Sequence, residues 1–510
     1  MKPSIPKGTR DFSPVEMVRR NFIFKTIREV FEKYGYQPIE TPAMEMIETL
    51  MGKYGNEGDK LIFKILNSGD FLSKARQAAA EAFSKHILSS DELKELYVKN
   101  EHYKIFEYAM LKSNEKNLIE NVLDNSSILS EAEKIGLEIS EKALRYDLTV
   151  PFARYVVQHQ NEITFPFKRY QIQPVWRADK PQKGRYREFY QCDADVIGSN
   201  SLLNEVEIVQ MIDDVYSKLG IPVTIKINNR KILTGIAELY NLKERFKDFV
   251  IALDKIDKIG IEGVEKELNE KGLSRIDIRT VLVRQSIAKG IKFSDDSDMA
   301  LSDINNAFKK CNSEIGMKGI EEVISIANTV DETYKLNNPI EFDITLARGL
   351  EYYTGAIFEV KANDVQIGSI CGGGRYDDLT GIFGLPNVSG VGISFGIDRI
   401  FDVMNELNLF DSIGLTASTT KVLLAHFGEE ERKYCIGVAS QLRSAGINTE
   451  IYPDITKKIA KQFDYANKKQ IPFVIVIGGD EMKTGELTLK NMSSGEQTKM
   501  KVDEIVTQLK

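Results

Sequence analysis

Cysteine and histidine are scarce in this chain of 510 residues, and their scarcity excludes several kinds of site. The four cysteines lie far apart, with no pair at the spacing of metal ligands: Cys192, Cys311, Cys371 and Cys435. The four histidines are equally scattered: His86, His102, His159 and His426. Few, isolated thiols suit a reducing compartment and argue against a disulfide framework or a structural zinc. A mechanism that needs a histidine-rich metal site is likewise disfavoured.

Long apolar runs are also missing from the sequence. The opening, MKPSIPKGTRDFSP, contains no apolar core of the kind that export signals have. The longest run that reads as buried, Ile471–Ile477, is far shorter than the roughly 20 residues that span a bilayer. We therefore expect a cytoplasmic protein with no membrane partner.

An overall positive charge is absent as well, because the formal net charge is −7. From Ser418 to the end, 14 Lys and Arg stand against 12 Asp and Glu, which gives +2 there and −7 − 2 = −9 on residues 1–417. A mildly basic tail on an acidic body permits contacts to phosphate. By itself it does not predict a nucleic-acid partner.

The first third of the chain combines one clear helix with one segment that carries no motif. Apolar residues at helical spacing predict an amphipathic helix over residues 15–34. Gly35 can end this helix, and Tyr36–Glu40 then reads as a strand that runs into Pro42. Residues 68–142, rich in Ala, Glu, Lys, Leu and Ser, are predicted to form a solvated helical insertion.

Two β-like stretches enclose the most informative loop. Aromatic and β-branched residues predict strands at Phe167–Pro174 and Phe189–Ile197, joined as a long antiparallel hairpin by the basic loop Asp179–Arg187. An arginine at the end of one strand, Arg177, with a mobile basic loop beside it, can hold a polyphosphate through bidentate guanidinium contacts. For a generic basic hairpin, solvated surface residues are the commoner explanation.

The rest of the chain alternates between helical and strand-rich regions. A helical pattern over 228–335 precedes strand-like residues 340–360 and 367–371. The segment Cys371–Asp377 is then predicted to be a glycine-rich turn. Its glycines let backbone approach a ligand, but their spacing fits neither a Walker loop nor a dinucleotide fingerprint, and a plain tight turn is the alternative.

A strand-to-helix joint follows the glycines, and a small domain ends the chain. Gly392–Ile400 contains a helix that begins near Gly396 and carries Arg399 in its first turn, where simple helix capping is the alternative explanation. The stretch Asn408–Thr420 is the expected linker. Alternating strands and helices over 421–510 predict an α/β domain with a mostly parallel sheet.

Taken in order, these features resemble the three motifs of class II aminoacyl-tRNA synthetases. The helix leading to a strand that ends in proline resembles motif 1. Arg177, Asp179 (where Glu is usual), the basic loop, Arg185 and Phe189 resemble motif 2, and Gly392–Arg399 resembles motif 3. The resemblance implies an α+β fold, in which a mainly antiparallel sheet is flanked by helices, and a homodimer formed through motif 1.

Further stretches are similar to the histidyl-tRNA synthetase family in particular. The segment Ala347–Gly355 is similar to that family's histidine signature and has the sequence ARGLEYYTG. Arg145–Thr149 resembles its ammonium-binding segment, and Pro6–Phe12 is typical of its start. The tail resembles an anticodon-binding domain. The implied reaction is activation of L-histidine with ATP and transfer to the 3′ end of tRNA(His). The implied division is a catalytic domain at 1–227 and 336–407, a helical insertion domain at 228–335 and an anticodon-binding domain at 418–510.

The resemblance also implies roles for single residues. Arg177 and Arg348 are the expected catalytic cations, on opposite sides of the α-phosphate. The expected histidine-binding residues are Asp147, Leu148, Thr149, Arg177, Gln191, Asp195, Arg348, Tyr352 and Tyr353. The expected ATP-binding residues are Arg177, Asp179, Arg185, Arg187, Phe189, Gly374 and Arg399. Mg²⁺ would be held mainly by phosphate oxygens and water, with no certain protein ligand.

Two other functions fit parts of the same sequence. One is the synthetase-like regulatory subunit of ATP phosphoribosyltransferase, which binds ligands without making an adenylate. It typically lacks the anticodon-binding domain and parts of the catalytic signature, both of which this chain has. The other is a degenerate, RNA-sensing pseudoenzyme, against which Arg177, Arg348 and Arg399 argue.

Overall fold

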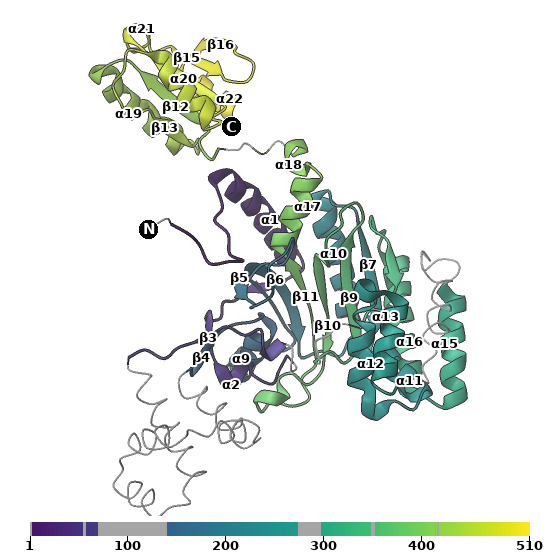
Figure 1. Cartoon of the computed structure of the whole chain (residues 1–510). Helices are drawn as coiled ribbons and strands as arrows, with labels where there is room; N and C mark the ends of the chain where they lie inside the picture. Colours follow the sequence, from purple (N-terminus) through teal and green to yellow (C-terminus); the bar gives the residue numbers. More distant parts are fainter. Residues whose placement is uncertain are drawn as a thin grey trace, which may run out of the picture. The chain divides into compact units, whose positions relative to one another are not determined.

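A computed structural model describes residues 3–54, 58–69, 140–273, 297–347, 352–413, 415 and 418–510. The chain divides into two compact units: Met1–Thr9 with Glu29–Ile400, and Arg10–Arg28 with Phe401–Lys510. Figure 1 follows the chain through both units. The predicted insertion at 68–142 lies almost wholly outside the described residues, as does Arg348. In the described parts of the chain, every helix is too short or too polar to cross a membrane.

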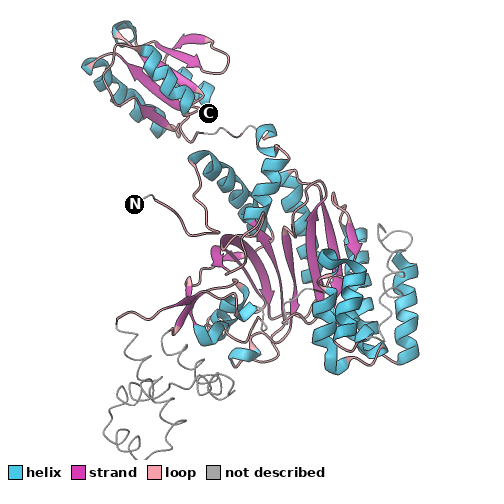
Figure 2. Cartoon of the chain, in the orientation of Figure 1, coloured by secondary structure: helices cyan, strands magenta, loops and turns pink. Residues whose placement is uncertain are grey.

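An eight-stranded sheet, drawn in magenta in Figure 2, forms the centre of the first unit. Its strand order is β1-β5-β6-β11-β10-β9-β7-β8. Only the outermost pairs, β1 with β5 and β7 with β8, are parallel, so the predicted α+β class with a mainly antiparallel sheet is confirmed. The strands are β1 (Gln37–Pro38), β5 (Phe167–Trp176), β6 (Glu188–Ile197), β7 (Val223–Asn229), β8 (Ile340–Phe342), β9 (Ala356–Ala362), β10 (Cys371–Tyr376) and β11 (Gly390–Gly396).

Strands β5 and β6 form the predicted hairpin, each ten residues long. Phe167 pairs with Ile197 and Trp176 with Glu188, so the whole length of both strands is hydrogen-bonded. Because side chains alternate along a strand, every second residue of each strand faces the same side of the sheet. One face of the hairpin is therefore apolar and the other carries the polar residues.

Helices cover the apolar face of the sheet. The helix predicted at 15–34 is confirmed as α1 (Pro14–Lys33), and α10 spans Leu203–Leu219. Phe31 near the end of α1 and Tyr216 of α10 both pack on Phe395 of β11, with ring centroids 5.8 and 5.7 Å apart. The opposite face is left for α9 (Thr149–Gln158) and a small sheet of β2 (Met44–Met46), β4 (Lys142–Leu144) and β3 (Lys64–Ile65), with α2 (Ile47–Leu50).

The region after β7 is helical, as the pattern over 228–335 predicts. Its helices are α11 (Arg230–Leu239), α12 (Phe246–Leu253), α13 (Ile256–Glu270), α15 (Ser297–Cys311) and α16 (Glu314–Thr333). Helix α16 packs against α10, α11 and β7, which fixes this group of helices at the β7–β8 end of the sheet (Figure 1). Beyond β11, α17 (Ile397–Glu406) and the short α18 (Leu409–Ser412) lead to the last segment.

The last segment is an α/β domain whose sheet has the order β13-β12-β14-β15-β16. Strand β12 is parallel to both β13 and β14, whereas β15 and β16 continue the sheet antiparallel, so the prediction of a mostly parallel sheet is wrong for its second half. The elements are β12 (Val422–His426), α19 (Glu429–Ser444), β13 (Thr449–Ile451), α20 (Ile459–Lys468), β14 (Phe473–Ile477), α21 (Gly479–Thr484), β15 (Leu487–Asn491), β16 (Gln497–Met500) and α22 (Val502–Leu509).

Candidate active site

A cleft opens on the polar face of the large sheet, and alternate residues of three strands form its floor. Strand β6 contributes Gln191, Asp193 and Asp195, and β11 pairs Ser394 with Asp193 and Gly392 with Asp195. On the next strand, β10, residues 372 and 374 continue these rows as glycines. The acidic side chains therefore stand beside a strip of residues without bulky side chains.

The glycines leave space that neighbouring side chains occupy. A Cβ atom on Gly392 would lie 1.9 Å from Asp195 Oδ1, and one on Gly374 would lie 2.9 Å from Tyr353 Cδ1. The predicted glycine-rich turn at Cys371–Asp377 is wrong, because residues 371–376 form strand β10, hydrogen-bonded to β9 and β11. Local composition favours a turn, but partner strands distant in sequence complete the backbone hydrogen bonds.

Asp195 lies buried at one end of the floor. Its Oδ2 forms an ion pair with Arg169 at 2.7 Å, and its Oδ1 accepts a hydrogen bond from the Tyr376 hydroxyl at 2.7 Å. Burial raises the pKa of Asp195, and the Arg169 guanidinium opposes that rise. A carboxylate has about four lone-pair positions, so Asp195 can still accept a hydrogen bond from a ligand.

Asp193, the next inward residue of β6, was not among the predicted site residues. It lines the cleft fully buried, and burial raises its pKa to about 7, against the opposing charge of Arg169. The Ser394 hydroxyl connects it to Gln191, because that hydroxyl accepts from Gln191 Nε2 at 2.8 Å and hydrogen-bonds to Asp193. The period-two alternation of a strand places residues 191, 193 and 195 on one face, and that signal identifies Asp193 from the sequence.

A third carboxylate reaches the cleft from the segment that precedes α9. Asp147 Oδ1 accepts hydrogen bonds from the Tyr54 hydroxyl at 2.9 Å and from the Val150 N–H at 3.2 Å. Burial raises the pKa of Asp147, and Arg177 opposes the rise. Thr149 lines the cleft beside it, whereas Leu148 is buried outside the lining and offers its carbonyl oxygen to Arg169 at 3.3 Å.

Arg177 leaves the end of β5 and crosses one wall of the cleft. Its Nε donates to the Tyr146 carbonyl at 3.0 Å, and its Cζ lies 4.3 Å from the centre of the Tyr146 ring and 5.1 Å from that of Phe189. These contacts fix the guanidinium plane between two aromatic rings. Arg177 lines the cleft and interacts electrostatically with Asp147.

The basic loop closes the other wall. Arg399 donates from Nε to the Gly184 carbonyl at 2.7 Å and from Nη1 to the Ser369 carbonyl. Asp179 and Arg185 face each other across the loop at 3.9 Å, and both line the cleft. Arg187 lies outside the lining. Its Nε donates a hydrogen bond to the Asp179 carbonyl at 3.2 Å, and its backbone N–H donates to the Gly8 carbonyl at 2.8 Å.

Two tyrosines of the predicted histidine signature form the remaining wall. The rings of Tyr352 and Tyr353 lie 4.8 Å apart, and Tyr352 meets Tyr376 edge to face at 6.3 Å. Burial raises the pKa of Tyr352 well above its ordinary value, so its hydroxyl keeps its proton and can donate. Residues 348–351 of the same signature lie outside the described residues.

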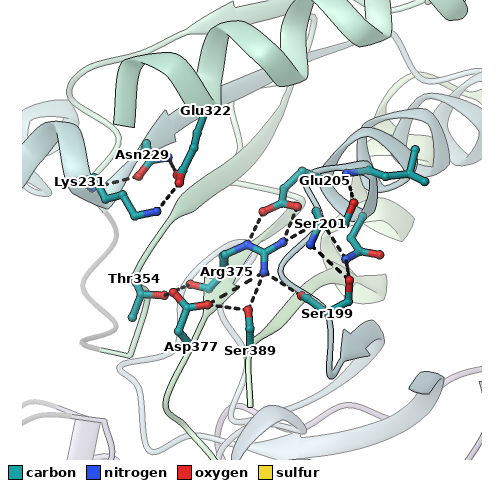
Figure 3. Close-up of polar contacts among 12 residues, drawn as sticks. Ser199, Ser201, Glu205, Asn229, Lys231, Glu322, Thr354, Arg375, Asp377 and Ser389 are labelled. Atoms are coloured by element: carbon teal, nitrogen blue, oxygen red, sulfur yellow. Dashed lines mark hydrogen bonds and ion pairs between the residues drawn. The ribbon is translucent and has the colours of Figure 1, made fainter. Parts of the chain in front are cut away.

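A buried polar network braces this wall from behind (Figure 3). Arg375, next to Tyr376 on β10, forms a bidentate ion pair with Glu205 of α10, with both N–O distances 2.6 Å. It also donates to the Ser389 hydroxyl at 2.6 Å. Its carbonyl oxygen accepts the backbone N–H of Thr354 at 2.9 Å. The network therefore couples the position of Tyr376 to the end of the histidine signature.

The structure thus brings most of the predicted residues into one cleft. The described ones that line it are Asp147, Thr149, Arg177, Asp179, Arg185, Phe189, Gln191, Asp195, Tyr352, Tyr353, Gly374 and Arg399. Leu148 and Arg187 stand behind the lining. The lining offers five carboxylates and three guanidinium groups, together with aromatic faces, so the cleft suits a ligand that carries both a cationic end and a polyanionic end.

Known proteins match this chain over nearly its whole length. A family model described as histidyl-tRNA synthetase matches residues 8–73 and 140–400, and one described as an anticodon binding domain matches 421–510. A histidine–tRNA ligase of Bacteroides fragilis (strain YCH46) is 53% identical over 505 residues, covering 99% of this chain and 98% of that protein. A crystal structure of histidyl-tRNA synthetase from Nostoc sp. PCC 7120 has a TM-score of 0.74 at 27% identity, covering 100% and 99% of the two chains.

Proposed function

The chain belongs to the histidyl-tRNA synthetase family, and on that premise we propose how its residues divide the work between them. The enzyme activates histidine with ATP to histidyl-adenylate and then transfers histidine to tRNA. The observation that carries the assignment of residues is the single cleft in which Arg177, Arg399 and a set of buried carboxylates meet. The regulatory-subunit alternative is not favoured, since the full-length relative is a ligase.

In the first step a carboxylate oxygen of histidine attacks the α-phosphorus of ATP. A bond forms between that oxygen and the α-phosphorus, the bond to the β-phosphate oxygen breaks, and pyrophosphate leaves. Charge on the phosphoryl oxygens must be stabilised throughout, so orientation and fixed cations are the enzyme's main contribution. We assign Arg177 to bridge the α-phosphate and the histidine carboxylate, because two aromatic rings already hold its guanidinium. Arg348 is assigned to the opposite side of this phosphate by resemblance alone.

ATP is assigned to the half of the cleft beside the basic loop. Arg399 and Arg185 would contact its phosphates, with Phe189 and Gly374 beside the nucleotide and Asp179 orienting the loop. Arg187 would act from behind, through its contact with the Asp179 carbonyl. Mg²⁺ would enter on the nucleotide, coordinated mainly by phosphate oxygens and water. It would neutralise the polyphosphate when bound.

Histidine is assigned to the acidic half. Asp147, Thr149 and Gln191 would receive its α-ammonium, with Leu148 buried behind them to hold the segment. Asp195 and the hydroxyls of Tyr352 and Tyr353 would hold the imidazole. A pocket whose buried polar groups need the ring's hydrogen bonds rejects an analogue without them by about 10⁴-fold.

The other parts of the chain are assigned by resemblance to their family counterparts. Residues 418–510 would read the anticodon of tRNA(His), and 228–335 would approach the acceptor arm, which brings the 3′-terminal adenosine to the adenylate. The catalytic domain would comprise 1–227 and 336–407. Motif 1 would form a homodimer, which light scattering of the purified protein tests. A cytoplasmic location fits a function in protein synthesis.

Histidine-dependent exchange of pyrophosphate into ATP tests the activation step directly. We expect exchange by the full chain, and at least a 100-fold lower rate for Arg177→Ala with an unchanged thermal melt. Lys180→Ala is the matched control, because it removes an exposed cation of the same loop outside the cleft lining, and a loss below about tenfold is expected. Absence of exchange in folded wild-type protein would indicate a binding paralogue or a pseudoenzyme.

A further inference from the structure

Three acceptor atoms line the cleft with no hydrogen-bond partner among the residues that the structure describes. They are Asp147 Oδ2, Gln191 Oε1 and Asp193 Oδ1, and each is buried. A buried acceptor without a donor is costly, and native structures retain few of them. Three such atoms in one cleft indicate a ligand group that brings several hydrogen-bond donors to this place.

An ammonium group has this chemistry, because it carries three N–H donors and no acceptor. We propose that Asp193 is the third acceptor for the α-ammonium of histidine, beside Asp147 and Gln191, and so helps to bind and position the amino acid. The inference rests on the proposed function of the cleft and refines it. Thr149, whose side chain is partly exposed, then takes a secondary position.

Asp193 suits this role better than its neighbour Asp195. Both oxygens of Asp195 already have partners, Arg169 and Tyr376, whereas Asp193 Oδ1 has none among the described residues. Along β6, Asp193 stands midway between Gln191 and Asp195, about 7 Å from each. It therefore lies between the ammonium end and the imidazole end of the bound amino acid.

Ser394 of β11 orients the two acceptors of β6, Gln191 and Asp193, toward the ligand. Its hydroxyl accepts from Gln191 Nε2, which turns Gln191 Oε1 away from Ser394 and leaves it for the cleft. The hydroxyl's one proton serves Asp193. One serine thus fixes the amide of Gln191 and one oxygen of Asp193, and the other oxygen of Asp193 is left for a donor.

Carboxylates gather in this part of the cleft and attract a cation. Asp147, Asp193 and Asp195 interact with one another, and the guanidinium groups of Arg145, Arg169 and Arg177 interact with them. A bound ammonium adds a cation beside Asp147 and Asp193, and the low dielectric of a buried site strengthens its attraction to the two carboxylates.

Binding of ligands that lack one end of histidine separates the possibilities. Isothermal titration with L-histidine, with histidinol (ammonium and ring) and with 3-(imidazol-4-yl)propionate (ring without ammonium) is measured for wild type and Asp193→Asn. We expect Asp193→Asn to bind histidine and histidinol about 10- to 100-fold more weakly, which is the effect of one charge-assisted hydrogen bond. Affinity for imidazolylpropionate is expected to change less than twofold.

Two comparisons keep this test specific. Thr149→Val is expected to weaken the binding of histidine less than Asp193→Asn does. Asp213→Asn alters another buried aspartate, which accepts from Asn337 and Asn338, and is expected to lower stability without changing the ratio of ligand affinities. Asp193→Asn relieves repulsion with Asp195 and is expected to fold. If it does not, Asp193→Ser is measured with the same expectations.

Equal weakening of all three ligands would overturn the proposal, since Asp193 would then face the ring. Unchanged affinity for histidine would also overturn it. Both outcomes are distinct from failure of the proposed function, in which wild-type protein itself neither binds histidine nor catalyses pyrophosphate exchange. In the exchange assay, the KM for histidine of Asp193→Asn should rise while the KM for ATP stays within twofold.

Discussion

The ion pair between Arg375 and Glu205 gives a quantitative test of how the active site is held in place. The two side chains are 5% and 0% exposed, and two N–O contacts of 2.6 Å join them. Removal of one partner from a buried pair costs about 3–5 kcal/mol, because the other charge stays buried. After Glu205→Ala, Arg375 keeps its hydrogen bonds to the Ser389 hydroxyl and to two backbone carbonyls. We therefore expect the free energy of unfolding to fall by about 3 kcal/mol, the lower end of that range.

Urea denaturation followed by tryptophan fluorescence measures the free energy of unfolding of the unit that contains this ion pair. Trp176 is the only tryptophan and ends strand β5, so its emission reports on the large sheet. Glu207→Ala is the matched control on the same helix. Its pair with Lys168 is about a quarter exposed on both sides, so we expect a loss within 1 kcal/mol.

A double-mutant cycle decides whether the pair acts as a unit. Arg375→Ala combined with Glu205→Ala leaves no unpaired charge, so the double variant should lose at least about 2 kcal/mol less than the sum of the single losses. Because Arg375 precedes Tyr376, both single variants should also bind histidine more weakly. Additive losses, or a cost of Glu205→Ala no larger than that of Glu207→Ala, would refute the reasoning.

Three further changes test the floor and walls of the cleft. Gly392→Ala places a Cβ 1.9 Å from Asp195 Oδ1, so the KM for histidine should rise by about tenfold or more in the exchange assay, with the KM for ATP within twofold. Arg399→Ala removes the cation held at Gly184, and we expect the KM for ATP to rise about tenfold while calorimetric histidine affinity stays constant. The histidine affinity of wild type divided by that of Asp193→Asn is free of the titration of histidine itself, which affects both proteins equally. This ratio should fall about tenfold from pH 8 to pH 6, because a pKa of about 7 reduces the ionised fraction of Asp193 over that range. A rise in the KM for ATP of Gly392→Ala, a weaker histidine complex of Arg399→Ala, or a flat pH profile would contradict them.

The sequence predicts the frame of the site better than its floor. Local alternation of residues predicts the hairpin of β5 and β6, and the position of Arg177 at the end of β5 predicts its place at the site. Local sequence does not predict strand β10, because CGGG is a turn-like composition and the hydrogen bonds that make it a strand come from β9 and β11. In the last domain no strand is predicted at β15 or β16. Three of the four residues of β16 are exposed, Lys499 among them, so its sequence lacks the alternation of a half-buried strand.

Glycine on the floor and carboxylates beside it have a common physical reason. Because Gly392 and Gly374 carry no side chain, Asp195 and Tyr353 can lie close to the sheet, and a ligand ring is recognised only if such groups around it are fixed. Asp195 is fixed by Arg169 and Tyr376, and Tyr376 in turn by the buried network at Arg375. The acidic residues cannot relax toward an incorrect ligand, so an amino acid that lacks a donor leaves a buried acceptor unpaired at a cost of about 1–3 kcal/mol for each atom. Selectivity for histidine therefore depends as much on the rigidity of the sheet behind the cleft as on the residues that touch the substrate.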